Sequence, residues 1–445
     1  MDSSSSNNID SSQRIIEFEG DIDHRIDIPD LSRVLIISRD QSYLTHGIHK
    51  FPAKFYPELP RFLIRAYSQS GGYVLDPMCG SGTVVLEAML NKRKGVGLDI
   101  DPMARLVTKV KTTPIAGSIL DTIHRWIDSE INSRMDSANH VPALPEFNYR
   151  DNWFLDFVLS ELAIIKEVIS QLEWNGPLEK ESHQVRNDAA DFVKIVFSSI
   201  IRDVSNADPH CTRTVIRKKQ IRNISPGQTV EKFGHALVKQ ISAMRELDAI
   251  ASEQSLERPD VLPGSALNTG IESESIDLAI TSPPYINAVD YPRTHQLEMY
   301  WLDLMAEGPL SKMKRKYIGT ETVYKAEYKD LRLSGLESLD PLLERIFRSD
   351  PRRSYIVSRF FEEMTQQLQE THRVLVPGGR YCIVIGSNRI RQVLVPSHEI
   401  LEEIARVVVG FEVEKRFFSG LIRHFIKIPR KERMTGEWVL ILKKT

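Results

Sequence analysis

The stretch YVLDPMCGSGTVVLEAMLNKRKGVGLDIDP, residues 73–102, decides the fold. It predicts, in order, a strand over 73–75, an acid at Asp76, a glycine loop with Gly80 and Gly82, a helix over 83–90, and a strand over 95–98 that ends in Asp99. A strand, a helix and a second parallel strand in this order make a half-unit of a doubly wound sheet. We therefore expect an α/β fold with an open, largely parallel sheet.

The glycine loop predicts a small-molecule site at the carboxyl ends of these two strands. Glycines let a ligand approach the backbone, helix N-terminal amides offer donors, and an acid ending the second strand commonly binds ribose hydroxyls. Asp76 stands before the glycines, which disfavours a pyrophosphate and suits a cationic cofactor. The sulfonium and amino-acid groups of S-adenosylmethionine meet that requirement. A loop that only caps the helix is the alternative, and acids on two successive strands argue against it.

A second informative stretch is IDLAITSPPYINAVDYP, in which a predicted strand over 276–280 leads into Ser282-Pro283-Pro284-Tyr285. The prolines stiffen the backbone and lack an N–H, so their carbonyls are left to accept hydrogen bonds. The Ser282 hydroxyl and a proline carbonyl suit the two hydrogens of a planar amino group, and Tyr285 can stack on the ring behind it. The four residues alone would fit a simple turn equally well.

Together these stretches resemble the S-adenosylmethionine-dependent DNA amino-methyltransferases, in particular the cytosine-N4 group with a TSPPY motif. A third match is IHKFPAKFYPELPRFLI, residues 48–64, which resembles the family segment that packs over the cofactor. VLPGSALNTG resembles the loop that contacts adenine, although many relatives carry Asp where this chain has Ser265. The resemblance covers about residues 45–113 and 260–445.

The resemblance implies a class I, Rossmann-like methyltransferase sheet with antiparallel C-terminal strands, S-adenosylmethionine as cofactor and double-stranded DNA as substrate. It also implies two sets of site residues. The catalytic set is Ser282, Pro283, Pro284 and Tyr285. The cofactor set is Phe51, Pro52, Ala53, Lys54, Asp76, Met78, Gly80, Gly82, Thr83, Asp99, Ile100 and Ser265.

The cysteines favour transfer to an exocyclic nitrogen over attack on a ring carbon. There are three cysteines, and none follows a proline as the nucleophile of cytosine-C5 enzymes does. Adenine-N6 enzymes of the family usually have Asp at the position of Ser282, so cytosine N4 is the expected target. Adenine N6 and an RNA guanine-N2 remain alternatives, and a non-catalytic DNA-binding module is a further one. His46 and His49 lack a supporting Cys or His cluster, so no metal is expected.

The 445-residue chain has a net charge of −2, which argues against a uniformly basic nucleic-acid binder. DNA binding would then need a local positive cleft. Residues 213–227 and 310–319 are the basic stretches, with a solvated charged face as the alternative reading. The candidate phosphate contacts are Arg213, Arg217, Lys218, Lys219, Arg222, Lys314, Arg315 and Lys316.

Four segments are expected. Residues 1–44 form a tail and lead-in with a strand candidate at 34–37, and 45–113 form the cofactor half. Residues 114–259 show apolar positions at helical spacing and predict a helical insertion that recognises the target sequence. Residues 260–445 form the catalytic half. No apolar run is long enough to span a bilayer. The resemblance implies a cytoplasmic, nucleoid-associated prokaryotic enzyme and, as a possible partner, a restriction endonuclease acting on the same site.

Overall fold

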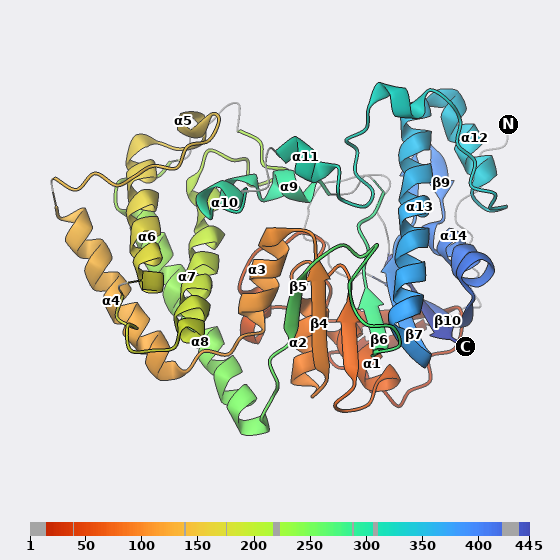
Figure 1. Ribbon diagram of the computed structural model, residues 1–445, viewed down its shortest axis with the longest axis horizontal. Helices are drawn as coiled ribbons and strands as arrows, with labels where there is room; N and C mark the ends of the chain where they lie inside the picture. Colours follow the sequence, from red (N-terminus) through yellow and green to blue (C-terminus); the bar gives the residue numbers. More distant parts are fainter. Residues whose placement is uncertain are drawn as a thin grey trace.

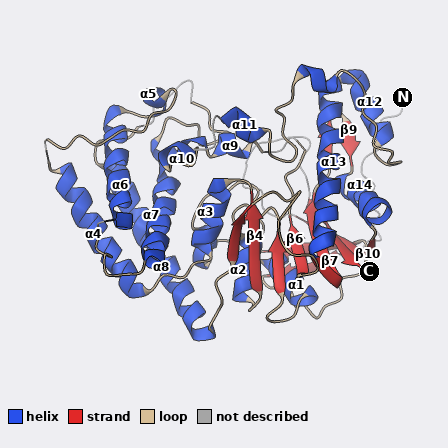
Figure 2. Ribbon diagram, viewed as in Figure 1, coloured by secondary structure: helices blue, strands red, loops and turns tan. Residues whose placement is uncertain are grey.

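The computed structural model describes residues 15–445 except 39, 138, 175, 217–222, 287–288, 306–309 and 421–435. Its centre is a nine-stranded sheet flanked by helices (Figures 1 and 2). In spatial order the strands are β1 (Ile15–Glu19), β2 (Ser32–Ile37), β10 (Phe411–Gly420), β11 (Gly436–Lys444), β7 (Leu375–Ile385), β6 (Ile276–Thr281), β3 (Tyr73–Asp76), β4 (Lys94–Asp99) and β5 (Asp260–Pro263).

The five strands from β7 to β5 are all parallel, and β11 is antiparallel to both of its neighbours, β7 and β10. This confirms the class I methyltransferase sheet with antiparallel C-terminal strands. The apolar candidate at 34–37 is confirmed as part of β2, which pairs in parallel with β10 and is itself extended by β1. The sheet therefore has nine strands, with β1 and β2 forming one edge beyond β10.

The described helices include those predicted over 83–90 and within 114–259. They are α1 (Glu58–Tyr67), α2 (Thr83–Leu90), α3 (Pro102–Lys111), α4 (Gly117–Met135), α5 (Arg150–Trp153), α6 (Asp156–Trp174), α7 (His183–Val204), α8 (Gln228–Gln254), α9 (Tyr291–Thr294), α10 (Gln296–Trp301), α11 (Leu310–Lys314), α12 (Asp340–Ser349), α13 (Pro351–Val374) and α14 (Ser397–Glu403). Short turns of helix lie at Leu44–Gly47, Lys325–Tyr328 and Ile404–Val409, and β8 (Asn388–Ile390) pairs with β9 (Val393–Val395) in a small hairpin. No described helix combines the length and apolar composition that crossing a bilayer requires.

Alternate residues of the buried strands supply two cores. Val74, Leu278 and Ile280 point to a cluster with α1 and α2, whereas Leu75 and Ala279 point to a cluster with α12, α13 and α14. This alternation follows from the two-residue period of a strand, and it covers both faces of the parallel region. The loops at the carboxyl ends of the strands are then left to form the site.

The predicted insertion is helical. Helices α4, α6, α7 and α8 pack together at the β5 side of the sheet, beside α3 (Figure 1). Their apolar residues form one cluster with residues of α2, α3 and α10, and Trp301 of α10 is fully buried within it, as expected for a core residue. The insertion thus shares its core with the cofactor half.

Two regular elements contain a local irregularity. Gly378 and Gly379 lie inside β7, where pairing with β6 is interrupted between Leu375 and Arg380. The chain turns at this interruption, where Gly378 has φ +79° and a Cβ on Gly379 would lie 2.8 Å from the Val376 carbonyl oxygen. Helix α14 is followed by a π-helical turn that ends at Gly410.

Candidate active site

Asp76 and Asp99 end the adjacent parallel strands β3 and β4, so both carboxyl groups reach the same edge of the sheet. Asp76 Oδ1 accepts hydrogen bonds from Thr281 Oγ1 at 2.8 Å and from the Met78 amide at 3.2 Å. Asp99 Oδ2 accepts from the Gly80 amide at 2.9 Å, which ties the glycine loop to the second strand. The loop is therefore built around the two acids.

The loop needs its glycines. Gly82, the residue before α2, has φ +74°, and a Cβ there would lie 2.6 Å from Thr108 Cγ2. Thr108 Oγ1 in turn donates to the Gly80 carbonyl at 3.0 Å. A side chain at 82 would both strain the backbone and displace the residue that supports the loop.

Burial raises the pKa of Asp76 to about 7 and that of Asp99 to about 7, against the hydrogen bonds that lower them. Asp101, which caps α3 through the Met103 amide at 2.8 Å, also has a raised pKa because it is buried. Three acids in one buried region disfavour an anionic ligand. They favour a ligand that brings positive charge and hydrogen-bond donors.

A cavity of about 850 Å³, partly open to solvent, lies over these acids. Every predicted cofactor residue except Gly82 lines it, so the structure brings together three segments that are far apart in the sequence. They are the segment 51–55, the glycine loop with both acids, and Ser265. Ser265 Oγ accepts from the Leu267 amide at 3.2 Å, so its hydroxyl is held at the cavity wall.

The predicted catalytic loop enters the same cavity. It follows β6, the neighbour of β3, and Thr281 at the end of β6 bonds directly to Asp76. Ser282 and Pro284 line the cavity, whereas Pro283 is buried. Tyr285 is not among the lining residues: it packs against the core, and its hydroxyl donates to Glu437 at the start of β11.

The segment 51–55 covers one side of the cavity. Phe51 stacks on Tyr291 with ring centroids 5.9 Å apart and on His295 with centroids 4.9 Å apart. Ala53 lies within it at φ +53°, a backbone conformation that alanine rarely adopts. Lys54 Nζ donates to the Gln41 carbonyl at 2.9 Å and the His46 carbonyl at 3.1 Å. We call residues 51–55 the lid.

Several lining residues were not predicted, among them Tyr317, Ile318 and Asp101. Tyr317 and Ile318 reach the cavity from a loop more than thirty residues after the TSPPY motif, and no local pattern marks them. Asp101 had a visible signal, since an Asp before Pro at the start of a helix predicts an N-cap. Shortly after the TSPPY motif, Asp290 caps α9 and Tyr291 lines the cavity.

The predicted DNA contacts are scattered. Arg217, Lys218, Lys219 and Arg222 lie outside the described residues, and Arg213 is half exposed, 3.9 Å from Glu321. Lys314 pairs with Asp290 at 2.7 Å and Arg315 with Glu327 at 3.1 Å, while Lys316 lines the cavity. These contacts remain predictions.

The residues around the cavity fit S-adenosylmethionine. Asp76 and Asp99 suit its cationic and ribose groups, and the buried Asp101, which faces the Tyr317 hydroxyl, lines the same cavity. The Cys79 thiol also faces the cavity, but burial raises its pKa well above the ordinary value, which disfavours a thiolate nucleophile. Among the described residues no group of three or more His, Cys, Asp or Glu side chains could hold a metal ion.

Comparison with known proteins finds similarity to proteins described as DNA methylases and Type II methyltransferases. A family described as DNA methylase matches residues 23–109. The Type II methyltransferase M.MvaI of Kocuria varians is 25% identical over 439 residues, which cover 90% of this chain and 91% of that protein. The Type II methyltransferase M.BsoBI of Geobacillus stearothermophilus is 23% identical over 413 residues, 82% of this chain and 78% of that protein. The solved structure of TTHA0409, a putative DNA modification methylase from Thermus thermophilus in complex with S-adenosyl-L-methionine, shows 24% identity over 20% of this chain and 38% of that chain, with a TM-score of 0.17.

Proposed function

Since the chain belongs to the N6/N4 family of S-adenosylmethionine-dependent DNA methyltransferases, we propose that it transfers the methyl group to the exocyclic N4 of cytosine in duplex DNA. One observation carries this proposal: Ser282 and Pro284 line the same cavity as Asp76 and Asp99. A hydroxyl acceptor beside a stiff proline backbone is suited to an amino group. The two acids on the neighbouring strands are suited to a cationic methyl donor.

One group of residues binds the cofactor and another group holds the target base. Asp99 binds the ribose hydroxyls, Asp76 and the lid bind the cationic methionine part, and Ser265 contacts the adenine. S-adenosylmethionine supplies an electrophilic methyl group on a positively charged sulfur. The remaining catalytic task of the chain is to place a weakly nucleophilic amino nitrogen in line with that methyl group.

In a base pair the cytosine N4 is engaged and cannot reach the cavity, so the target base must leave the duplex. Ser282 Oγ and the Pro283 carbonyl accept the two amino hydrogens. Stacking of Tyr285 on the ring requires its side chain to leave the core and its hydroxyl to release Glu437 when the base enters. Holding both hydrogens draws electron density onto nitrogen as N4 moves from planar towards tetrahedral geometry. The N4 atom gains the methyl group and loses one proton during or after transfer. A serine hydroxyl is a weak base, so we assign Ser282 to orientation and not to abstraction of that proton.

The choice of cytosine over adenine rests on Ser282, since both bases present an amino group next to a ring nitrogen. Adenine-N6 transfer is the alternative, and the same cavity would accept it without a change in the cofactor residues. We further propose that the helical insertion, residues 114–259, takes part in recognising the target sequence. The basic side chains named above then contact phosphates, and an endonuclease that cuts the same site is a possible partner.

The test is to incubate the purified protein with S-adenosylmethionine and unmethylated plasmid DNA, then to quantify methylated nucleosides by mass spectrometry. We expect N4-methylcytosine. N6-methyladenine without N4-methylcytosine would overturn the choice of base and keep the enzyme class. Cofactor binding without any methylated DNA nucleoside would overturn the DNA assignment and direct the search to RNA.

A further inference from the structure

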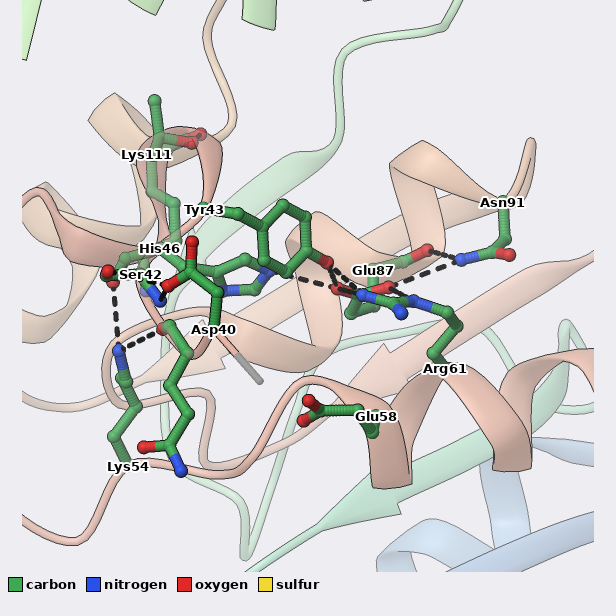
Figure 3. A network of polar contacts seen from close by, with 12 residues as sticks. Asp40, Ser42, Tyr43, His46, Lys54, Glu58, Arg61, Glu87, Asn91 and Lys111 are labelled. Atoms are coloured by element: carbon green, nitrogen blue, oxygen red, sulfur yellow. Dashed lines mark hydrogen bonds and ion pairs between the residues drawn. The ribbon is translucent and has the colours of Figure 1, made fainter. Parts of the chain in front are cut away.

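Glu87 is a fully buried carboxylate on α2, one helical turn after Thr83 of the cofactor loop. It lies at the centre of a polar network between α1, α2 and the segment that leads into the lid (Figure 3). Oε2 accepts from Arg61 Nε at 2.9 Å, and Oε1 accepts from Arg61 Nη2 at 3.1 Å and from His46 Nε2 at 3.0 Å. The Tyr43 hydroxyl also donates to Oε1.

The charge state of this network follows from burial and pairing. Burial acts to raise the pKa of Glu87, but the hydrogen bonds from His46 and Arg61 outweigh it and hold the pKa below its usual range. Burial lowers the pKa of His46 to about 4, so its imidazole is neutral at neutral pH and donates from Nε2. Glu87 is therefore an anion paired with the largely buried Arg61 and bonded to three neutral donors: the Tyr43 hydroxyl, the His46 imidazole and, at 3.4 Å, the Asn91 amide.

Tyr43 and His46 precede the lid in the chain. Tyr43 caps the start of the turn Leu44–Gly47 and His46 lies within that turn, while Lys54 inside the lid donates to the carbonyls of Gln41 and His46. Thr45 Oγ1 adds a bond to the Lys111 carbonyl at 2.7 Å. Hydrogen bonds from Lys54 thus link the two ends of the segment 41–54, and the Glu87 carboxylate links this segment to α2.

We propose that Glu87 is a positioning residue for S-adenosylmethionine: through Tyr43 and His46 it holds the lid in its closed place over the cavity before the cofactor binds. This inference rests on the proposed function. If the lid is already closed, none of the binding free energy is used to order it. If the lid is closed only part of the time, the apparent affinity for the ligand falls in proportion to the closed fraction. Glu87 does not line the cavity, so its effect on the cofactor is indirect.

The test uses Glu87→Gln, which keeps the shape of the side chain and removes its charge. Calorimetric titration without DNA should give a dissociation constant for S-adenosylmethionine weaker by roughly tenfold, as expected if the closed lid falls to about a tenth of the population. The KM for the cofactor should rise in step, while kcat at saturating cofactor and the KM for DNA stay unchanged. Hydrogen exchange of residues 43–55 should accelerate in the free protein and slow again with saturating cofactor.

A second variant covers the case in which Glu87→Gln fails to fold because Arg61 loses its buried partner and keeps only the more exposed Asp21. Tyr43→Phe removes one hydroxyl and keeps the ion pair, and we expect a smaller loss of affinity, of a few fold, with the same exchange pattern. The matched control is Glu161→Gln, a buried carboxylate that accepts from the Gly227 amide at 2.6 Å in the helical insertion. Its variant should leave the dissociation constant for the cofactor unchanged.

The outcomes separate this inference from the proposed function. A folded Glu87→Gln or Tyr43→Phe protein that binds the cofactor as tightly as the wild type would overturn the positioning role and leave the methyltransferase assignment standing. A general rise in hydrogen exchange across the protein, without a local rise at the lid, would also overturn it. A wild-type protein that does not bind S-adenosylmethionine would overturn both.

Discussion

Asp76 and Asp99 are the residues that set how cofactor binding depends on pH. Both have a pKa of about 7 in the free protein, raised by burial, so each is only partly ionised at neutral pH. A cationic ligand favours the ionised forms, and binding therefore releases protons. We expect the affinity for S-adenosylmethionine to be on the order of tenfold weaker at pH 6 than at pH 8 for each acid that must ionise.

Calorimetry at several pH values, in buffers of different ionisation enthalpy, measures this affinity and the proton release together. S-adenosylhomocysteine, which lacks the sulfonium charge, is the control ligand and should show a weaker dependence. Equal affinity at pH 6 and pH 8 would mean that both acids are already ionised in the free protein.

Ser282 is the residue on which the catalytic assignment depends. Ser282→Ala removes one acceptor for the target amino group while leaving the acids and the lid intact. We expect cofactor affinity to be retained and kcat to fall roughly a hundredfold or more, because a preorganised polar contact to the reacting group is lost. The control is Ser275→Ala, a partly exposed serine before β6 that does not line the cavity. Full activity of Ser282→Ala, measured as methyl transfer to plasmid DNA, would remove Ser282 from the mechanism.

At the scale of elements, Gly82 in the loop between β3 and α2 can be compared with Gly227, which precedes α8. Gly82 and Gly227 both precede a helix and both have positive φ, +74° and +87°. A Cβ on Gly82 would collide with Thr108, whereas a Cβ on Gly227 would meet nothing within 4 Å. Gly227→Ala should therefore cost about 1–2 kcal/mol of stability from its backbone conformation alone.

Gly82→Ala should cost about 1–3 kcal/mol beyond that from overpacking. It should also weaken cofactor binding, because Thr108 supports the Gly80 carbonyl. Thermal denaturation and cofactor titration of both variants give the two effects separately. Equal stability of the two variants would show that the loop can shift to accept the extra carbon.

The elements around the cavity differ in how far the sequence alone could predict them. The helix over 83–90 and its two flanking strands were predictable because loop, helix and acids form one continuous stretch with glycines at the turns. Tyr317 and Ile318 were not predictable, because their place at the cavity depends on how a long loop returns to the sheet. The two added edge strands show the same limit: pairing of β2 with β10 joins segments almost 400 residues apart.

For the whole molecule, the main result is that the helical insertion and the cofactor half share one hydrophobic core. Leu86 of α2 and Val107 of α3 belong to the same buried cluster as Phe197 of α7 and Leu247 of α8. The sequence predicted the insertion's helices from their periodicity, but periodicity indicates only which face of a helix is apolar and not what covers it. The helical insertion and the cofactor half are thus packed against each other through shared apolar side chains.

This shared core predicts a single cooperative unfolding transition for the chain. Unfolding the insertion alone would expose Leu86, Val107 and Val110, which are all buried against it, so the cofactor half has no independent core on that side. Differential scanning calorimetry should give one transition, and S-adenosylmethionine at a hundred times its dissociation constant should stabilise the whole protein by about 2.7 kcal/mol. Two transitions, of which the cofactor shifts only one, would contradict a common core. In that case the insertion would be an autonomous domain, and a chain lacking residues 114–259 should still fold and bind the cofactor.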